Sequence, residues 1–116
     1  MRCFLVEGTA SRARETVVSK LARFFPAASP IRLPIRLTRL EREPAASENT
    51  VIEYGTPREI FFASALSLEF AEKLRIQNSD SSLDVEVQVV AVQLHEVQLA
   101  VAARFLGEVS NWILKP

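Results

Sequence analysis

The feature that most constrains this chain is a succession of short stretches in which apolar and polar residues alternate, running from Val51 to Leu106. A period of two places successive side chains on opposite faces of a strand, so each stretch predicts a half-buried β-strand. An earlier stretch at 31–38 has the same period and adds a further strand. Short antiparallel strands with even turn spacing favour a closed barrel, because closure removes the sheet edges.

The predicted strands are separated by turn residues, of which Gly55-Thr56-Pro57 and the polar loop 78–82 are the clearest. At Val89-Val90 the apolar residues change from one face of the strand to the other, which predicts a β-bulge. After Gly107 the pattern changes again, and residues 108–114 suggest a short C-terminal helix. The six predicted strands cover residues 31–38, 50–54, 60–63, 73–77, 83–94 and 97–105. Pro34 lies within the first of them, where it cannot donate to a ladder.

Before the strands, the chain has a helical period over about 11–25. One stripe is apolar, as in an amphipathic helix, with Ser11 as a candidate N-cap and Pro26 beyond the end. We therefore divide the chain into an N-terminal extension, 1–28, and a barrel with its C-terminal helix, 29–116. The short apolar run Cys3–Val6 is a possible edge strand. The helix stripe needs a partner surface, either its own barrel or another copy, and it consists of Val17, Val18, Leu21, Phe24 and Phe25.

Composition places the chain among ordinary globular proteins, with 48% apolar and 24% charged residues in 116. The single cysteine cannot form an internal disulfide, and no apolar run is long enough for a membrane span, so we expect a cytoplasmic protein. Charge is unevenly distributed: residues 1–42 contain nine basic and three acidic residues, and residues 43–116 contain five and eleven. Such a division marks either an anion-binding face or two segments that neutralise each other.

Three segments, in order, resemble the PilZ domain family of bacterial cyclic di-GMP receptors. They are Ser29-Pro-Ile-Arg-Leu-Pro-Ile-Arg-Leu-Thr38, Val51-Ile-Glu-Tyr-Gly-Thr-Pro-Arg-Glu-Ile-Phe-Phe62 and Val85-Glu-Val-Gln-Val-Val-Ala-Val92 with the strand that follows. The resemblance covers roughly residues 29–106 and depends on the order and pattern of the strands. It implies a six-stranded antiparallel barrel with a C-terminal helix, the same architecture that the periodicity predicts.

The resemblance also implies a ligand site in two parts. The first is an arginine pair spaced Arg-x-x-x-Arg before the first strand, suited to bidentate contact with phosphates and guanine edges. Its positions fall near Phe24 and Ala28, so both arginines are absent. Arg32 and Arg36 have the same spacing but lie within the strand, on its outer face. They are candidates either for ligand contact or for a solvated strand surface.

The second part is an Asp/Asn-x-Ser-x-x-Gly turn, which aligns with residues 54–59. Thr56 keeps a hydroxyl at the serine position. Tyr54 replaces the acid or amide, and Glu59 replaces the glycine with a carboxylate that would repel phosphate. A shift by one residue places Glu53 at the acidic position but loses the hydroxyl. Arg58 is a remaining candidate for contact with an anion, or for an ion pair with Glu59.

We expect no catalysis, cofactor or metal site, because His95 has no cysteine or second histidine to share a metal and no serine or cysteine partner whose position the sequence fixes. The expected function is a PilZ-like signalling adaptor with weak or no cyclic di-GMP binding that acts through protein–protein contacts, including self-association. One alternative is a divergent cyclic di-GMP receptor using Arg32, Arg36 or Arg58. A second is a small barrel that binds nucleic acid through its basic N-terminal third.

Overall fold

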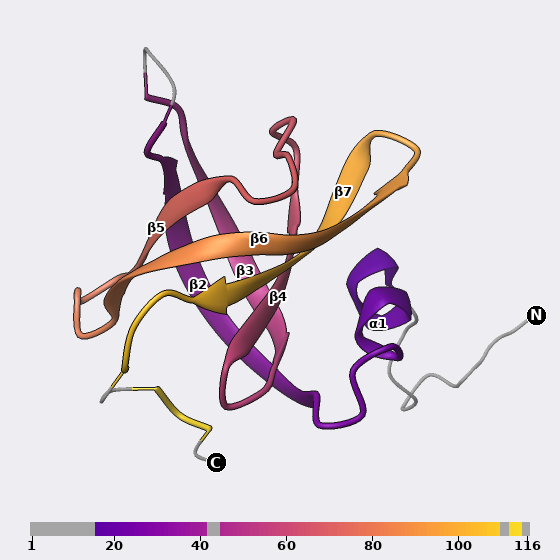
Figure 1. Cartoon of the computed structure of the whole chain (residues 1–116), viewed down its shortest axis with the longest axis horizontal. Coiled ribbons are helices and arrows are strands. Elements are labelled where there is room, and N and C mark those ends of the chain that lie inside the picture. The colour runs from indigo at the N-terminus through magenta and orange to yellow at the C-terminus, as the bar shows by residue number, and fades with distance from the viewer. Residues whose placement is uncertain (1–15, 42–44, 110–111, 115–116) are drawn as a thin grey trace, which may run out of the picture.

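The computed structural model describes residues 16–41, 45–109 and 112–114, which form a six-stranded antiparallel β-barrel with one short helix against its outside (Figure 1). The prediction of a mainly β, closed six-stranded barrel is confirmed. The elements are α1 (Val17–Ala22), β2 (Ser29–Arg39), β3 (Ser47–Gly55), β4 (Glu59–Ser64), β5 (Lys73–Asn78), β6 (Asp84–His95) and β7 (Gln98–Phe105).

The barrel is made of two three-stranded meanders joined along two seams. Strands β2, β3 and β4 pair in sequence order, and so do β5, β6 and β7. One seam pairs β4 with β7, with Phe62 opposite Val101, and the other pairs β2 with β5, with Ile35 opposite Asn78. Since every pair is antiparallel and the order closes on itself, each strand of the barrel has a neighbour on both sides over at least part of its length.

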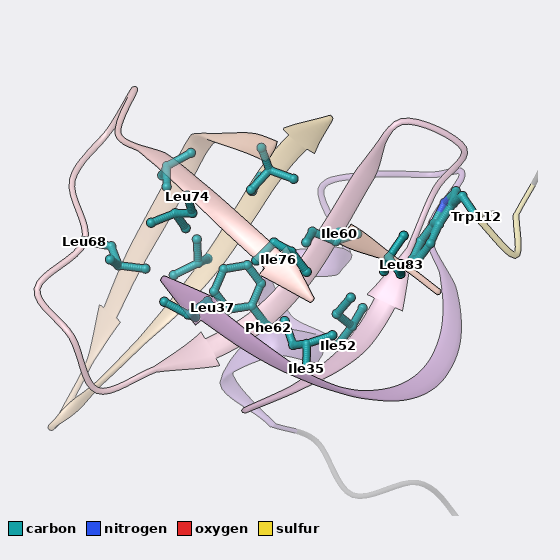
Figure 2. Close-up of a cluster of buried hydrophobic side chains, with 14 residues drawn as sticks. Ile35, Leu37, Ile52, Ile60, Phe62, Leu68, Leu74, Ile76, Leu83 and Trp112 are labelled. Carbon is teal, nitrogen blue, oxygen red and sulfur yellow. The ribbon is translucent and has the colours of Figure 1, made fainter. Parts of the chain in front are cut away.

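The core lies inside the barrel and consists of the residues that the alternation places inward. Phe62 is its largest fully buried member, and Figure 2 shows the core extending between Leu68 and Trp112. Removing each such side chain from water contributes roughly 1.5–3 kcal/mol to folding. Within this core, the leucine, isoleucine and valine residues with no exposed surface are Leu37, Ile52, Ile60, Leu74, Ile76, Val87 and Val101.

Three register shifts adjust the barrel walls, and one of them lies between Ile52 and Tyr54 of β3. The β6–β7 ladder shifts between Val89 and Ala91, which confirms the bulge predicted from the change of apolar face. The third shift lies between Pro30 and Leu33 of β2, where proline has no N–H to donate. The bulge allows β6 to continue beyond the barrel wall as one arm of a long hairpin with β7, which projects away from the barrel in Figure 1.

Helix α1 begins after Thr16 and not after Ser11, which lies outside the described residues together with 12–15 and Cys3–Val6. Thr16 caps the helix, because its hydroxyl accepts a hydrogen bond from the Ser19 N–H at 3.1 Å and the Ser19 hydroxyl accepts one from the Thr16 N–H at 2.8 Å. The helix ends at Ala22, so the predicted end near residue 25 is wrong by one turn. The turn at 23–24 precedes Pro26.

The predicted C-terminal helix is wrong for the described residues of that segment, 108–109 and 112–114, none of which is helical. The chain instead crosses the end of the barrel next to Gly55, where Trp112 is 3% exposed. Its indole N–H donates to the Thr56 carbonyl at 2.7 Å, and its ring meets Phe105 edge-on at 5.1 Å. Trp112 can be anchored in this way without a helix. The apolar spacing of Val109 and Trp112 therefore reflects contact with the barrel and not a helical period.

Candidate functional site

The turn between β3 and β4, which the resemblance identifies as a ligand site, is held together by Thr56. Its hydroxyl donates to Glu59 Oε1 at 2.5 Å and accepts from the backbone N–H groups of Arg58 and Glu59 at 3.0 and 2.8 Å. The Thr56 residue is only 4% exposed. A hydroxyl with one donor and two acceptor sites is saturated by these three bonds. Thr56 therefore stabilises the turn and has no remaining group for a ligand.

The Glu59 carboxylate is also engaged within the protein. Its Oε2 accepts from Arg104 Nη2 at 3.0 Å and from Nε at 3.2 Å, and its side chain is 13% exposed. Arg104 lies opposite Glu59 on the neighbouring strand β7. The ion pair that the sequence suggested between Glu59 and Arg58 is replaced by this cross-strand pair. Arg58 is exposed on this turn.

The two residues considered for the acidic position of the turn have structural roles. Tyr54 packs in the cluster beneath α1, on the outer side of the barrel. Glu53 lies at the register shift of β3, and its Oε1 accepts from the Thr16 hydroxyl at 2.9 Å. This bond links the helix cap to the barrel wall, so Glu53 contributes to placing α1. In either register, the residue at the acidic position is committed to contacts with the N-terminal segment.

Arg32 and Arg36 are both exposed on β2, as the alternation predicts. Arg36 borders a surface hollow with a volume of about 400 Å³. Asn49 of β3 and Gln77 of β5 lie opposite Arg36 on either side, so one cation is flanked by two amides. Arg32 and Arg58 do not line this hollow. The structure thus brings none of the other predicted ligand residues together with Arg36.

The predicted contact stripe of α1 faces the protein's own barrel over most of its length. Val18 and Leu21 are buried against Phe61, Ala100 and Ala102, which lie on the outer side of β4 and β7. Val17 and Phe25 pack at the margin of this cluster, with the Phe25 ring 4.7 Å from Phe61. Phe24 alone projects away and is 75% exposed. Because the side chains of Ala100 and Ala102 are small, α1 can pack closely against β7.

An uncovered apolar surface lies at the end of the β6–β7 hairpin. Val92, Leu94 and Val97 are 39, 72 and 87% exposed, and the two-residue turn includes Glu96 at a positive φ of 57°. His95 is exposed as well, next to this turn. The sequence indicated these residues as part of a barrel strand, but the strands here extend past the barrel and lose its core.

At the barrel end from which this hairpin projects, a buried ion pair was missed by the sequence reasoning. Arg39 and Glu72 are 8 and 6% exposed, and their bidentate contact has N–O distances of 2.6 and 2.8 Å. Arg39 also donates to the Ser67 carbonyl at 3.0 Å. Hydrogen bonding to Glu72 raises the pKa of Arg39 above its ordinary value although burial opposes this. The signal was present, because Arg39 continues the inward phase of Leu33, Ile35 and Leu37.

Comparisons of the chain with family models, with curated proteins and with solved structures gave no match. Within the described ranges, no three histidine, cysteine, aspartate or glutamate side chains form a group suited to a metal ion. None of the helices in that part of the chain has the length and apolar character needed to cross a membrane. The function must therefore be argued from the geometry of the turn, the hollow and the hairpin.

Proposed function

We propose that this chain is a PilZ-like signalling module of cyclic di-GMP-type regulation that has weak or no affinity for the dinucleotide and acts through protein–protein contacts. The observation that carries this proposal is the closed set of interactions among Thr56, Glu59 and Arg104. A ligand at this turn would have to replace bonds that already satisfy the hydroxyl and the carboxylate. Leaving a partly buried carboxylate unpaired is costly, so the turn favours its own contacts.

The charge at the turn supports the same conclusion. A phosphate approaching Glu59 would meet a carboxylate where the family pattern has a glycine. Phe24 and Ala28 stand at the positions of the arginine pair, and neither can donate a side-chain hydrogen bond. With one part of the site internally paired and the other absent, little remains to bind a dinucleotide of two negative charges.

Protein contact is the activity that this barrel retains in our proposal. The α1 stripe is used mainly in contact with the barrel itself. Among the exposed large apolar residues, which include Phe24, Phe70 and Ile113, three gather at the end of the β6–β7 hairpin. Exposed apolar residues that gather on one element are typical of interaction surfaces. The hairpin thus takes the place of the helix face and of the C-terminal helix as the expected contact region.

The test is calorimetric titration of the purified chain with cyclic di-GMP at physiological salt. We expect no heat of binding at high micromolar ligand and no rise in the unfolding temperature, which a bound ligand would produce by mass action. A dissociation constant in the low micromolar range or tighter would contradict the proposal. The matched variant Glu59→Gln removes the repelling charge while keeping the side-chain size, so a gain of binding in this variant would identify Glu59 as the obstacle.

A divergent receptor is the second candidate, and the hollow beside Arg36 is the observation that favours it. Arginine between two amides offers donors for phosphate or for a base edge. If wild-type protein binds cyclic di-GMP and Arg36→Ala abolishes binding while Arg32→Ala does not, the receptor at this hollow replaces the adaptor. Equal loss in Arg58→Ala would instead indicate the β3–β4 turn.

A further inference from the structure

One edge of β6 has no strand beside it near the end of the hairpin. Strand β5 pairs with β6 only from Asp84 to Gln88. The loop before β5 covers the next residue, since the Val89 N–H donates to the Glu72 carbonyl at 2.9 Å and the Val89 carbonyl accepts from the Ala71 N–H at 2.8 Å. Beyond this point no described strand lies on that side, so residues 91–95 have β7 as their only strand neighbour.

The pairing register shows which backbone groups point outward along this edge. His95 and Gln98 flank a two-residue turn, so they form a hydrogen-bonded pair, and antiparallel pairs alternate from there. Gln93 therefore bonds to Ala100 on β7. Val92 and Leu94 belong to the intervening pairs and direct their N–H and C=O groups away from β7. These are the groups that a further strand would use.

The edge lacks the protection that exposed strands ordinarily have. Natural edges are shielded by lysine, proline or inward charges, because unprotected ones pair with other chains. Between Val87 and Ala103 the sequence contains one charged residue, Glu96, and no proline. On one face of the open edge the side chains are instead apolar, with Val92 and Leu94 39 and 72% exposed, whereas Gln93 and His95 alternate with them on the other face. This hairpin is thus chemically suited to accept a strand.

We propose that the open edge of β6 pairs with the same edge of a second copy of this chain, in antiparallel register about a two-fold axis at Gln93. In this register Val92 of one copy lies opposite Leu94 of the other, and Leu94 lies opposite Val92. Both residues direct their backbone N–H and C=O groups outward, so each of these two pairs is a hydrogen-bonded pair. Each pair exchanges two hydrogen bonds, which gives four between the two copies. The apolar side chains of both pairs lie on one face, where they contact each other.

Two properties favour a second copy over an unrelated partner. The first is that the segment 91–95 is self-complementary: the two-fold register brings apolar residues together and places no charges opposite each other. The second is that the two Glu96 residues lie at opposite ends of the joint ladder, roughly 20 Å apart at about 3.4 Å per residue, which exceeds the screening length of about 8 Å at physiological salt. The inference is independent of cyclic di-GMP, so it holds whether or not the dinucleotide binds.

The first experiment measures self-association by sedimentation over a wide range of protein concentration. We expect a reversible dimer that Leu94→Lys weakens at least about ten-fold, because it places a charge in the centre of the edge of each copy. Ile113→Lys is the matched control, since Ile113 is 60% exposed but lies beside Trp112 at the other end of the barrel. Thermal unfolding checks that both variants fold. A monomer at all concentrations, or equal loss of dimer in both variants, would overturn the proposal.

The second experiment tests the register. Residues in a non-hydrogen-bonded antiparallel pair have their Cα atoms about 4.5 Å apart, within the range that a disulfide spans. In a Cys3→Ser background, Gln93→Cys should form a covalent dimer under mild oxidation, whereas Gln98→Cys on the other arm of the hairpin should not. Equal cross-linking at both positions would show random collision and reject the two-fold register. Cross-linking at neither position would exclude this edge as the dimer contact.

Discussion

The two ends of the barrel are closed by different kinds of chemistry. Near Gly55 the closure is mainly apolar, with Trp112 packed over the core and one hydrogen bond to the Thr56 carbonyl. At the opposite end, Arg39 and Glu72 form a buried ion pair beneath the loop between β4 and β5. When an apolar side chain at the first end is shortened, the free energy of unfolding falls in proportion to the buried apolar area that is lost. An ion pair leaves an unpaired buried charge when either member is removed, so the second end should be the more sensitive.

Removing one member of the ion pair should have the largest effect. We expect Glu72→Ala to lower the free energy of unfolding by about 3–5 kcal/mol, because Arg39 would then be buried without its carboxylate. Chemical denaturation measures this. The double variant Arg39→Met with Glu72→Leu should recover part of the loss, since it replaces the pair by apolar side chains but leaves the Ser67 carbonyl and the Glu69 N–H without these partners. If the double variant is no more stable than Glu72→Ala, the unpaired charge is not the cause.

At the apolar end, Trp112→Phe should cost about 1–3 kcal/mol, because it removes the indole donor and leaves the Thr56 carbonyl unsatisfied. The measurement is again the free energy of unfolding. Ile113→Ala is the control, since this neighbour is exposed and should change stability little. A loss in Trp112→Phe larger than that in Glu72→Ala would reverse the comparison between the ends.

The close packing at Gly55 provides a more selective test. A Cβ atom at this position would lie 2.8 Å from Cζ2 of Trp112, so Gly55→Ala should cost about 1–3 kcal/mol through overcrowding. In the Trp112→Phe background the nearest contacting atom is absent, and the same substitution should cost less, with Cδ1 of Leu114 and Cδ1 of Ile31 still 3.2 and 3.3 Å from the added Cβ. A double-mutant cycle gives this difference directly. Additive losses would mean that the indole does not limit the space at Gly55.

Ala71, in the loop at the ion-pair end, has a positive φ of 70°, and its N–H is bonded to Val89. Glycine adopts this conformation without the steric cost that a Cβ adds. We therefore expect Ala71→Gly to raise the free energy of unfolding by up to about 1 kcal/mol. Ala65→Gly, in the same connection but without a positive φ, is the control and should be neutral or destabilising.

Removing the exposed ion pair between Arg75 and Asp84 should have the smallest effect on the free energy of unfolding. This result would sharpen the contrast with the buried ion pair. The hydrogen bond from Arg75 lowers the pKa of Asp84. Because the folded-state pKa is lowered, the stabilisation is present above the ordinary pKa of aspartate, about 3.9, and is lost as pH falls through the lowered value. Denaturation at several pH values should show that Asp84→Asn lowers the free energy of unfolding slightly at neutral pH and leaves it unchanged below the lowered pKa. A large loss at neutral pH would contradict a surface role.

Much of the fold was predictable because the barrel wall follows the period of two. The inward residues Leu37, Ile76 and Val87 are all fully buried, and the bulge at Val90 was visible in the change of face. The outer side of β7 was less informative, because Ala100 and Ala102 are buried by α1. The C-terminal segment was misjudged because the spacing of Val109 and Trp112 is helical by chance over so few residues.

The candidate site was predictable in its residues but not in its contacts. The sequence showed that Thr56 keeps a hydroxyl and that Glu59 brings a carboxylate. It did not show that Thr56 bonds to Glu59 or that Arg104 neutralises it, because the partner strand β7 lies more than forty residues away. The open edge of β6 was hidden for a related reason, since strand length alone does not reveal where a neighbour ends.

The division of the barrel into two meanders bears on how the chain folds. Each meander has hairpin connections between neighbouring strands, so its contacts are close in sequence and should form early, whereas both seams join distant segments and close later. Arg39 belongs to the first meander and Glu72 immediately precedes the second. Helix α1 covers the β4–β7 seam through Phe61 and Ala102. We therefore expect the slow step of folding to be the docking of two preformed halves. The Arg39–Glu72 ion pair and the packing of α1 on the β4–β7 seam should both form after the folding transition state.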